Sequence, residues 1–111
     1  MVLIFIIVLD PHRLEDILEA FLELGITGAT VLDARGMGQI LSEEIPIFAG
    51  LRNLFPGGKS EHSLVMSVAE EDKADQFLDL MPGICGSLEG RGTGIAFTVP
   101  VTRVEGLAKE L

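Results

Sequence analysis

The sequence contains no tryptophan and no tyrosine, and only one of its 111 residues is a cysteine. A single cysteine excludes an internal disulfide framework and a cysteine cluster for zinc or iron–sulfur ligation, and it favours a reducing, cytoplasmic compartment. Basic residues are also few: 8 Lys and Arg stand against 17 Asp and Glu, which gives a net charge of −9. Such a charge repels phosphate backbones and anionic lipid surfaces. We therefore expect no nucleic-acid partner.

The apolar run at residues 2–9 is too short to cross a bilayer, since its eight residues extend roughly 26 Å as a strand and about 12 Å as a helix. It has no basic residue before it and no small-residue cleavage site after it, so it does not resemble an export signal. Both alternating sets of its side chains are apolar. The run is therefore predicted to be a strand that must be buried on both faces.

The rest of the chain alternates helical and strand patterns, and 48% apolar residues suit one globular domain over residues 1–111. Asp10 is expected to cap a helix that carries Pro11 in its first turn and ends at Gly25. Pro82 and Gly83 are expected to end a second helix that begins at about residue 70. The remaining expected segments are strands at 27–36, 62–68 and 95–101, a long loop at about 37–61 and a Gly-rich loop at about 86–94.

The resulting order, βαββαβ, is typical of the ferredoxin-like α+β fold, in which two helices cover one face of an antiparallel four-stranded sheet. The other face is left without cover. Leaving several large apolar side chains in water there would forfeit about 1.5–3 kcal/mol for each of them. Self-association is the simplest remedy, so the pattern predicts a homo-oligomer.

Two short segments carry a family resemblance. Gly25-Ile26-Thr27-Gly28-Ala29-Thr30-Val31, followed after three residues by Arg35-Gly36-Met37-Gly38, resembles the strand and loop entry of the nitrogen regulatory P-II signalling proteins. Order and spacing agree over about 100 residues, including the long loop after the second strand and the Gly-rich loop before the last. The resemblance implies a ferredoxin-like homotrimer that regulates partners and is not an enzyme.

The same resemblance implies ligands and partners. P-II proteins bind adenine nucleotides (ATP, ADP or AMP) or another small anionic metabolite at clefts between subunits, and dock on a membrane transporter or an enzyme target through the long loop, here 37–61. Thr30, Gly36, Gly38 and Gln39 match family positions that line this cleft, and Lys59 resembles a family lysine that precedes the third strand. The expected effector-binding set is completed by three residues of the Gly-rich loop: Gly90, Arg91 and Gly92.

The sequence also departs from the P-II pattern. It has no tyrosine, so control by uridylylation of a loop tyrosine is absent. The lysine that usually ends the Gly-rich loop is replaced by Ile95, and the pair of arginines that usually follows the last strand is not reproduced in the segment 102–107. A charge-assisted grip on a triphosphate needs several such donors, and Arg91 is the candidate replacement.

Two alternatives remain open at this stage. Without the resemblance to P-II proteins over the rest of the chain, the glycines near residue 36 indicate an ordinary strand end with a tight turn. Five basic side chains in loops and strand ends either converge on an anion or are solvated separately: Arg35, Arg52, Lys59, Arg91 and Arg103.

Other classes of function compete with the P-II interpretation. The main one is a trimeric metal-binding or scaffold protein of the copper-tolerance type, without nucleotide binding. His12 and His62 lie far apart in sequence with no carboxylate at metal-ligand spacing, so both are predicted to be surface or packing residues. No set of residues indicates catalysis.

Overall fold

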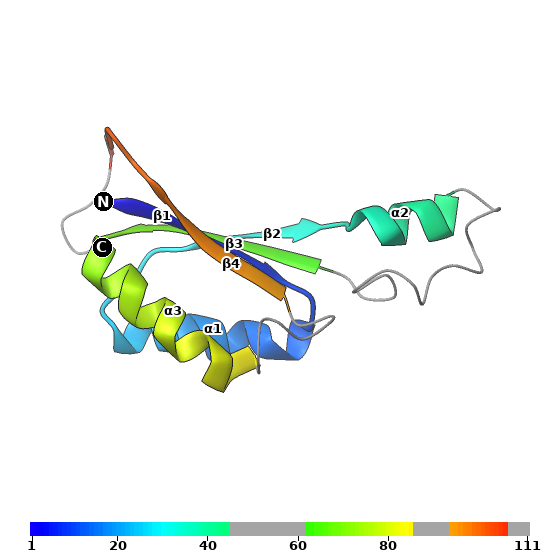
Figure 1. The fold of residues 1–111 in the computed structure, drawn as a ribbon, viewed down its shortest axis with the longest axis horizontal. Coiled ribbons are helices and arrows are strands. Elements are labelled where there is room, and N and C mark those ends of the chain that lie inside the picture. The colour runs from blue at the N-terminus through cyan, green and yellow to red at the C-terminus, as the bar shows by residue number, and fades with distance from the viewer. Residues whose placement is uncertain (45–61, 86–93, 107–111) are drawn as a thin grey trace.

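The computed structural model describes residues 1–44, 62–85 and 94–106. Four strands form one antiparallel sheet in the order β2-β3-β1-β4, which confirms the predicted ferredoxin-like topology. Two helices, α1 and α3, cover one face of this sheet, and α2 continues from the end of β2 away from the sheet (Figure 1). The elements are β1 (Val2–Val8), the 3-10 helix η1 (Pro11–Arg13), α1 (Leu14–Glu23), β2 (Thr30–Ala34), α2 (Met37–Glu44), β3 (His62–Ala69), α3 (Glu71–Cys85) and β4 (Gly94–Pro100).

The local signals around the first helix are confirmed. Asp10 caps η1, and its Oδ1 accepts a hydrogen bond from the backbone N–H of His12 at 2.9 Å. At the other end Gly25 has a φ of +79°, which an L side chain rarely adopts. The N–H of Gly25 donates to Leu22 and that of Ile26 to Phe21, so the chain leaves α1 through a Schellman turn.

Two of the predicted boundaries are wrong. Residues 37–44, assigned to a long loop, form α2, because Met37-Gly38-Gln39-Ile40-Leu41 contains good helix formers and the proline and glycine breakers come only after Glu44. The second helix does not end at Pro82 but continues to Cys85 with Pro82 inside it. Its apolar stripe continues past the proline, since Met81 is buried and Ile84 is half-buried against the core.

The second strand is also shorter than the predicted 27–36. Its ladder to β3 pairs Thr30 with Met66 at one end and Ala34 with His62 at the other. Before the strand, the carbonyl of Gly28 accepts a hydrogen bond from the Ser67 hydroxyl at 2.5 Å, which anchors this segment to β3. The remaining residues of the predicted long loop, 45–61, and residues 86–93 of the predicted Gly-rich loop lie outside the described residues.

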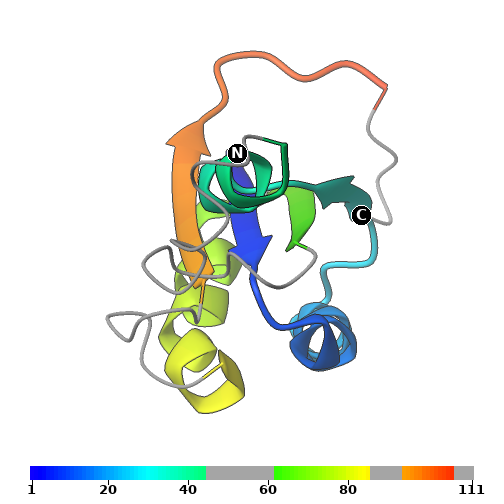
Figure 2. The same cartoon turned by 90° about the vertical axis from the view of Figure 1, so that its right-hand side faces the viewer.

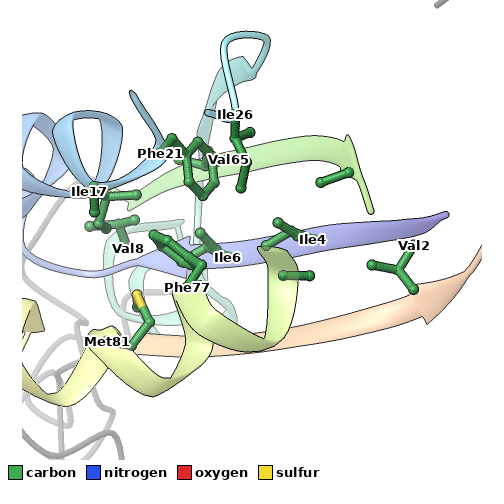
Figure 3. Packing of buried hydrophobic residues seen from close by; sticks show 13 residues of the cluster. Val2, Ile4, Ile6, Val8, Ile17, Phe21, Ile26, Val65, Phe77 and Met81 are labelled. Carbon is green, nitrogen blue, oxygen red and sulfur yellow. The ribbon is translucent and has the colours of Figure 1, made fainter. Parts of the chain in front are cut away.

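The core fills the space between the sheet and its two helices (Figure 3). The rings of Phe21 and Phe77 meet there with their centroids 4.5 Å apart, which joins α1 to α3 beneath the sheet. Burying each such ring contributes about 1.5–3 kcal/mol to stability. The largest fully buried side chains are Ile4, Ile6, Val8, Ile17, Phe21, Val65, Phe77 and Met81.

The opposite face of the sheet carries no described helix, as the two views of the ribbon show (Figures 1 and 2). Its side chains are mostly apolar. Between β1 and the edge strand β4, the rings of Phe5 and Phe97 stack on this face with their centroids 4.8 Å apart. Several of its side chains are exposed: Leu32 by 45%, Ile95 by 51% and Val99 by 42%. We call this surface, formed by Leu3, Phe5, Ile7, Leu32, Leu64, Met66, Val68, Ile95, Phe97 and Val99, the open sheet face.

Candidate functional site

A pocket lies where β2 ends and α2 begins. Asp33, Ala34, Arg35 and Gln39 line it, and its volume is about 420 Å³. The helix starts here because the N–H of Ile40 donates to the carbonyl of Gly36. The structure therefore brings Gln39, one of the predicted effector-binding residues, into a pocket with a guanidinium group, and it places Gly36 and buried Gly38 in the same turn.

Thr30 lines a different pocket, at the opposite end of β2. Its volume is about 450 Å³, and Leu3, Gly28 and Met66 are among the residues that line it. The six residue-to-residue steps from Thr30 to Gly36 span roughly 20 Å as an extended chain. One chain alone therefore does not bring Thr30 together with Gly36 and Gln39, although sequence position assigned all three to one cleft.

The other predicted site residues, Lys59, Gly90, Arg91 and Gly92, lie outside the described residues. Within the described ranges, no three His, Cys, Asp or Glu side chains are grouped closely enough to hold a metal ion. None of the helices in those ranges is long and apolar enough to cross a membrane.

Comparison with known families agrees with this fold. The model of the family "Nitrogen regulatory protein P-II" matches residues 1–110. The chain belongs to the P-II family. No curated protein matches its sequence. P-II proteins are regulatory signalling proteins without enzymatic activity, generally trimeric, and they bind effectors and partner proteins.

In this P-II chain, a packing contact with His62 also favours glycine at residue 36. The imidazole ring of His62, which is only 6% exposed, packs against it from the first position of β3. A Cβ at residue 36 would overlap Cε1 of that ring and lie 3.1 Å from its Nδ1. Sequence reasoning singled out Gly36 for a ligand and predicted a surface or packing role for His62, but it did not connect the two residues.

The contact between His62 and Gly36 predicts a coupled mutational effect. Gly36→Ala should lower the free energy of unfolding by about 1–3 kcal/mol, because the added methyl group displaces the ring in a packed site. His62→Ala in the same chain removes the overlap, so the double variant should lose less than the sum of the two single losses. Urea unfolding of the four proteins measures this coupling. If the losses in the free energy of unfolding are additive, the His62 ring moves away from the added methyl group without a cost in stability.

Proposed function

We propose that this P-II chain is a regulatory protein that assembles as a homotrimer, binds a small anionic effector between subunits and acts on a protein partner through residues 37–61. The open sheet face is the observation that carries this proposal. It exposes large apolar side chains from its two edge strands, β2 and β4, in a chain whose other sheet face is covered by helices. Surfaces of this kind are typical of interfaces, and P-II proteins are generally trimeric.

The two pockets support an effector site at the edge of that interface. Both adjoin β2, which is an edge strand of the sheet. Leu3, Thr30 and Met66 line one of them and point to the side of the open sheet face. A neighbouring subunit that covers this face would therefore border the pocket, and so Thr30 and residues of another chain would share one cleft.

Arg35 supports the anionic character of the effector. Its side chain lines the second pocket beside Gln39 and close to Gly36, where the proposed site requires a positive charge. A guanidinium group binds carboxylate or phosphate through paired, charge-assisted hydrogen bonds. The proposed effector-binding set is Thr30, Gly36, Gly38, Gln39, Lys59, Gly90, Arg91 and Gly92, with an adenine nucleotide as the first effector to test.

P-II membership and the composition support the rest of the proposal. The family is regulatory and binds partner proteins, and the segment 37–61 begins with a helix that projects from the sheet (Figure 1). A membrane transporter or an enzyme is the proposed target of this segment. The single cysteine fits a cytoplasmic location, and the net charge of −9 argues against nucleic acid as the partner.

A thermal-shift panel tests the effector, with the mass in solution measured in parallel. ATP, ADP, AMP, cyclic nucleotides, bicarbonate and 2-oxoglutarate are compared with divalent metals. A ligand at 100 times its dissociation constant should stabilise the protein by about 2.7 kcal/mol and raise its melting temperature by several degrees. We expect an adenine nucleotide to give such a shift.

Arg35→Gln should weaken binding of that nucleotide by about tenfold or more, because a hydrogen bond to a charged group contributes roughly 1.5–3 kcal/mol. Arg13→Gln is the matched control. Arg13 is also exposed, lies on η1 and has its Nε 3.7 Å from Asp10, outside both pockets. An intact trimer that responds to no anion would refute the effector site, and a response to divalent metals alone would favour the metal-binding alternative.

A further inference from the structure

The outer surface of the helical layer is strongly acidic. Its only basic side chain within α1 and α3 is Lys73, which lies beside Gly25 at the end of α1. The carboxylates are all exposed, four on each helix: Glu15, Asp16, Glu19 and Glu23 on α1, and Glu71, Asp72, Asp75 and Asp79 on α3.

Part of this surface is hollowed into a groove between the two helices. Asp16, Glu19 and Glu23 line it from α1, while Leu80, Gly83 and Ile84 line it from α3, and the volume is about 280 Å³. Leu80 is 43% exposed, although it sits in a helix whose apolar stripe is otherwise turned to the core. We call this the interhelical groove: one wall is acidic and the other is apolar.

The stability of α1 accounts for Asp16, which lies in the first turn where the helix dipole favours negative charge, but not for Glu19 and Glu23. Asp16, Glu19 and Glu23 follow one another at spacings of three and four residues, so they stack on one side of the helix, where like charges repel. Glu23 is the last residue of α1, at the end where the helix dipole favours positive charge. A positively charged partner bound along the groove would offset this repulsion between carboxylates, and the offset would contribute to binding affinity.

We propose that the interhelical groove binds a cationic amphipathic helix of a partner protein. Lysine or arginine side chains of that helix would lie against the carboxylates of α1, and its apolar side chains would contact Leu80 and Ile84. Charge disfavours other occupants of this acidic groove, because a second copy of this chain carries a net charge of −9 and nucleic acid and anionic membranes are also negative. Helices α1 and α3, which line the groove, lie on one side of the sheet (Figure 1). A trimer formed through the open sheet face, on the other side, would leave the groove accessible.

Fluorescence anisotropy with a labelled amphipathic peptide, lysines on one face and leucines on the other, tests the proposal. The full-length chain should bind this peptide, and a peptide of the same composition in scrambled order should bind more weakly. Replacing all three groove carboxylates (Asp16→Asn, Glu19→Gln and Glu23→Gln) should weaken binding at least about tenfold, since each lost ion pair at a desolvated site costs affinity. Leu80→Ser should weaken it as well, with the charge unchanged.

A control variant removes the same charge outside the groove, at the start of α3: Glu70→Gln, Glu71→Gln and Asp72→Asn. Its affinity should fall by less than about threefold, because charges outside the contact act only through the screened general field. Circular dichroism confirms that each variant is folded. Equal losses in the groove and control variants, or equal binding of the scrambled peptide, would show a non-specific attraction to an acidic surface and overturn the proposal.

Discussion

Replacing Phe97 with glutamate is expected to convert the proposed trimer into a folded monomer. Phe97 lies on the open sheet face with its ring stacked on Phe5, and 39% of its side chain remains exposed in the single chain. If subunits meet on this face, each copy of the variant loses about 1.5–3 kcal/mol of apolar burial. Each copy must also bury a carboxylate, which costs more still unless the group is paired.

The combined loss predicts at least a hundredfold weaker association, since about 1.4 kcal/mol corresponds to a factor of ten. Light scattering coupled to size-exclusion chromatography measures the mass directly, and circular dichroism follows the fold. Because Phe97 is not part of the core between the sheet and its two helices, the secondary structure of the variant should persist.

Val31→Glu is the matched control for this experiment. Val31 is 40% exposed, almost the same as Phe97, but it pairs with Val65 and therefore points to the helical side of the edge strand β2. The same charge is introduced at a similar exposed apolar side chain, so the control variant should keep the mass of the parent protein. A Phe97→Glu variant that stays trimeric would show that subunits do not meet on the open sheet face.

The sheet topology could be predicted because its signals are local and strong. The apolar run of β1, the cap at Asp10 and the turn at Gly25 each determine an element within a few residues. The predicted end of the second helix was wrong, because a helix-breaking residue indicates an end only when the residues after it do not pack against the core. Pro82 is tolerated near the end of α3, and Met81 and Ile84 on either side of it still pack into the core or against it.

The candidate site was less predictable, because its geometry depends on contacts between distant segments. Sequence position assigned Thr30 and Gln39 to one cleft, but β2 holds them at pockets on opposite ends of a strand. In the proposed trimer a second subunit would complete the cleft, and no pattern in one chain describes how that subunit is placed. The packing of His62 on Gly36 joins the first residue of β3 to the turn between β2 and α2, and a long segment separates the two in the sequence. No periodic pattern in the sequence therefore indicates this contact.

Gly94 provides the second large expected effect, a loss of stability on replacement by alanine. The sequence suggested only a flexible Gly-rich loop here, but Gly94 begins β4, pairs with Val8 and has a φ of +133°. An added Cβ would lie 2.6 Å from the carbonyl oxygen of Ile7, which is backbone and cannot turn away. The variant must therefore strain its own backbone or pull β4 away from β1.

Gly94→Ala should lower the free energy of unfolding by about 3 kcal/mol, since a residue held in a disfavoured backbone region costs roughly 1–3 kcal/mol and ladder hydrogen bonds are lost as well. For a chain of this size the melting temperature should fall by more than about 10 °C. Urea and thermal unfolding are measured at one fixed protein concentration, because the stability of an oligomer depends on concentration.

Gly83→Ala separates this effect from a general sensitivity to added methyl groups. Gly83 lies inside α3, and a Cβ there would meet no atom of the described residues within 4 Å outside its own stretch of helix. Alanine in a helix is favoured over glycine, so this variant should be more stable than the parent by about 0.5–1 kcal/mol. Opposite signs for the two glycines would show that β4 depends on close approach to β1 at Gly94. A Gly94→Ala variant as stable as the parent would mean that this end of the ladder can separate without cost, and β4 would then not hold the end of the Gly-rich segment against β1.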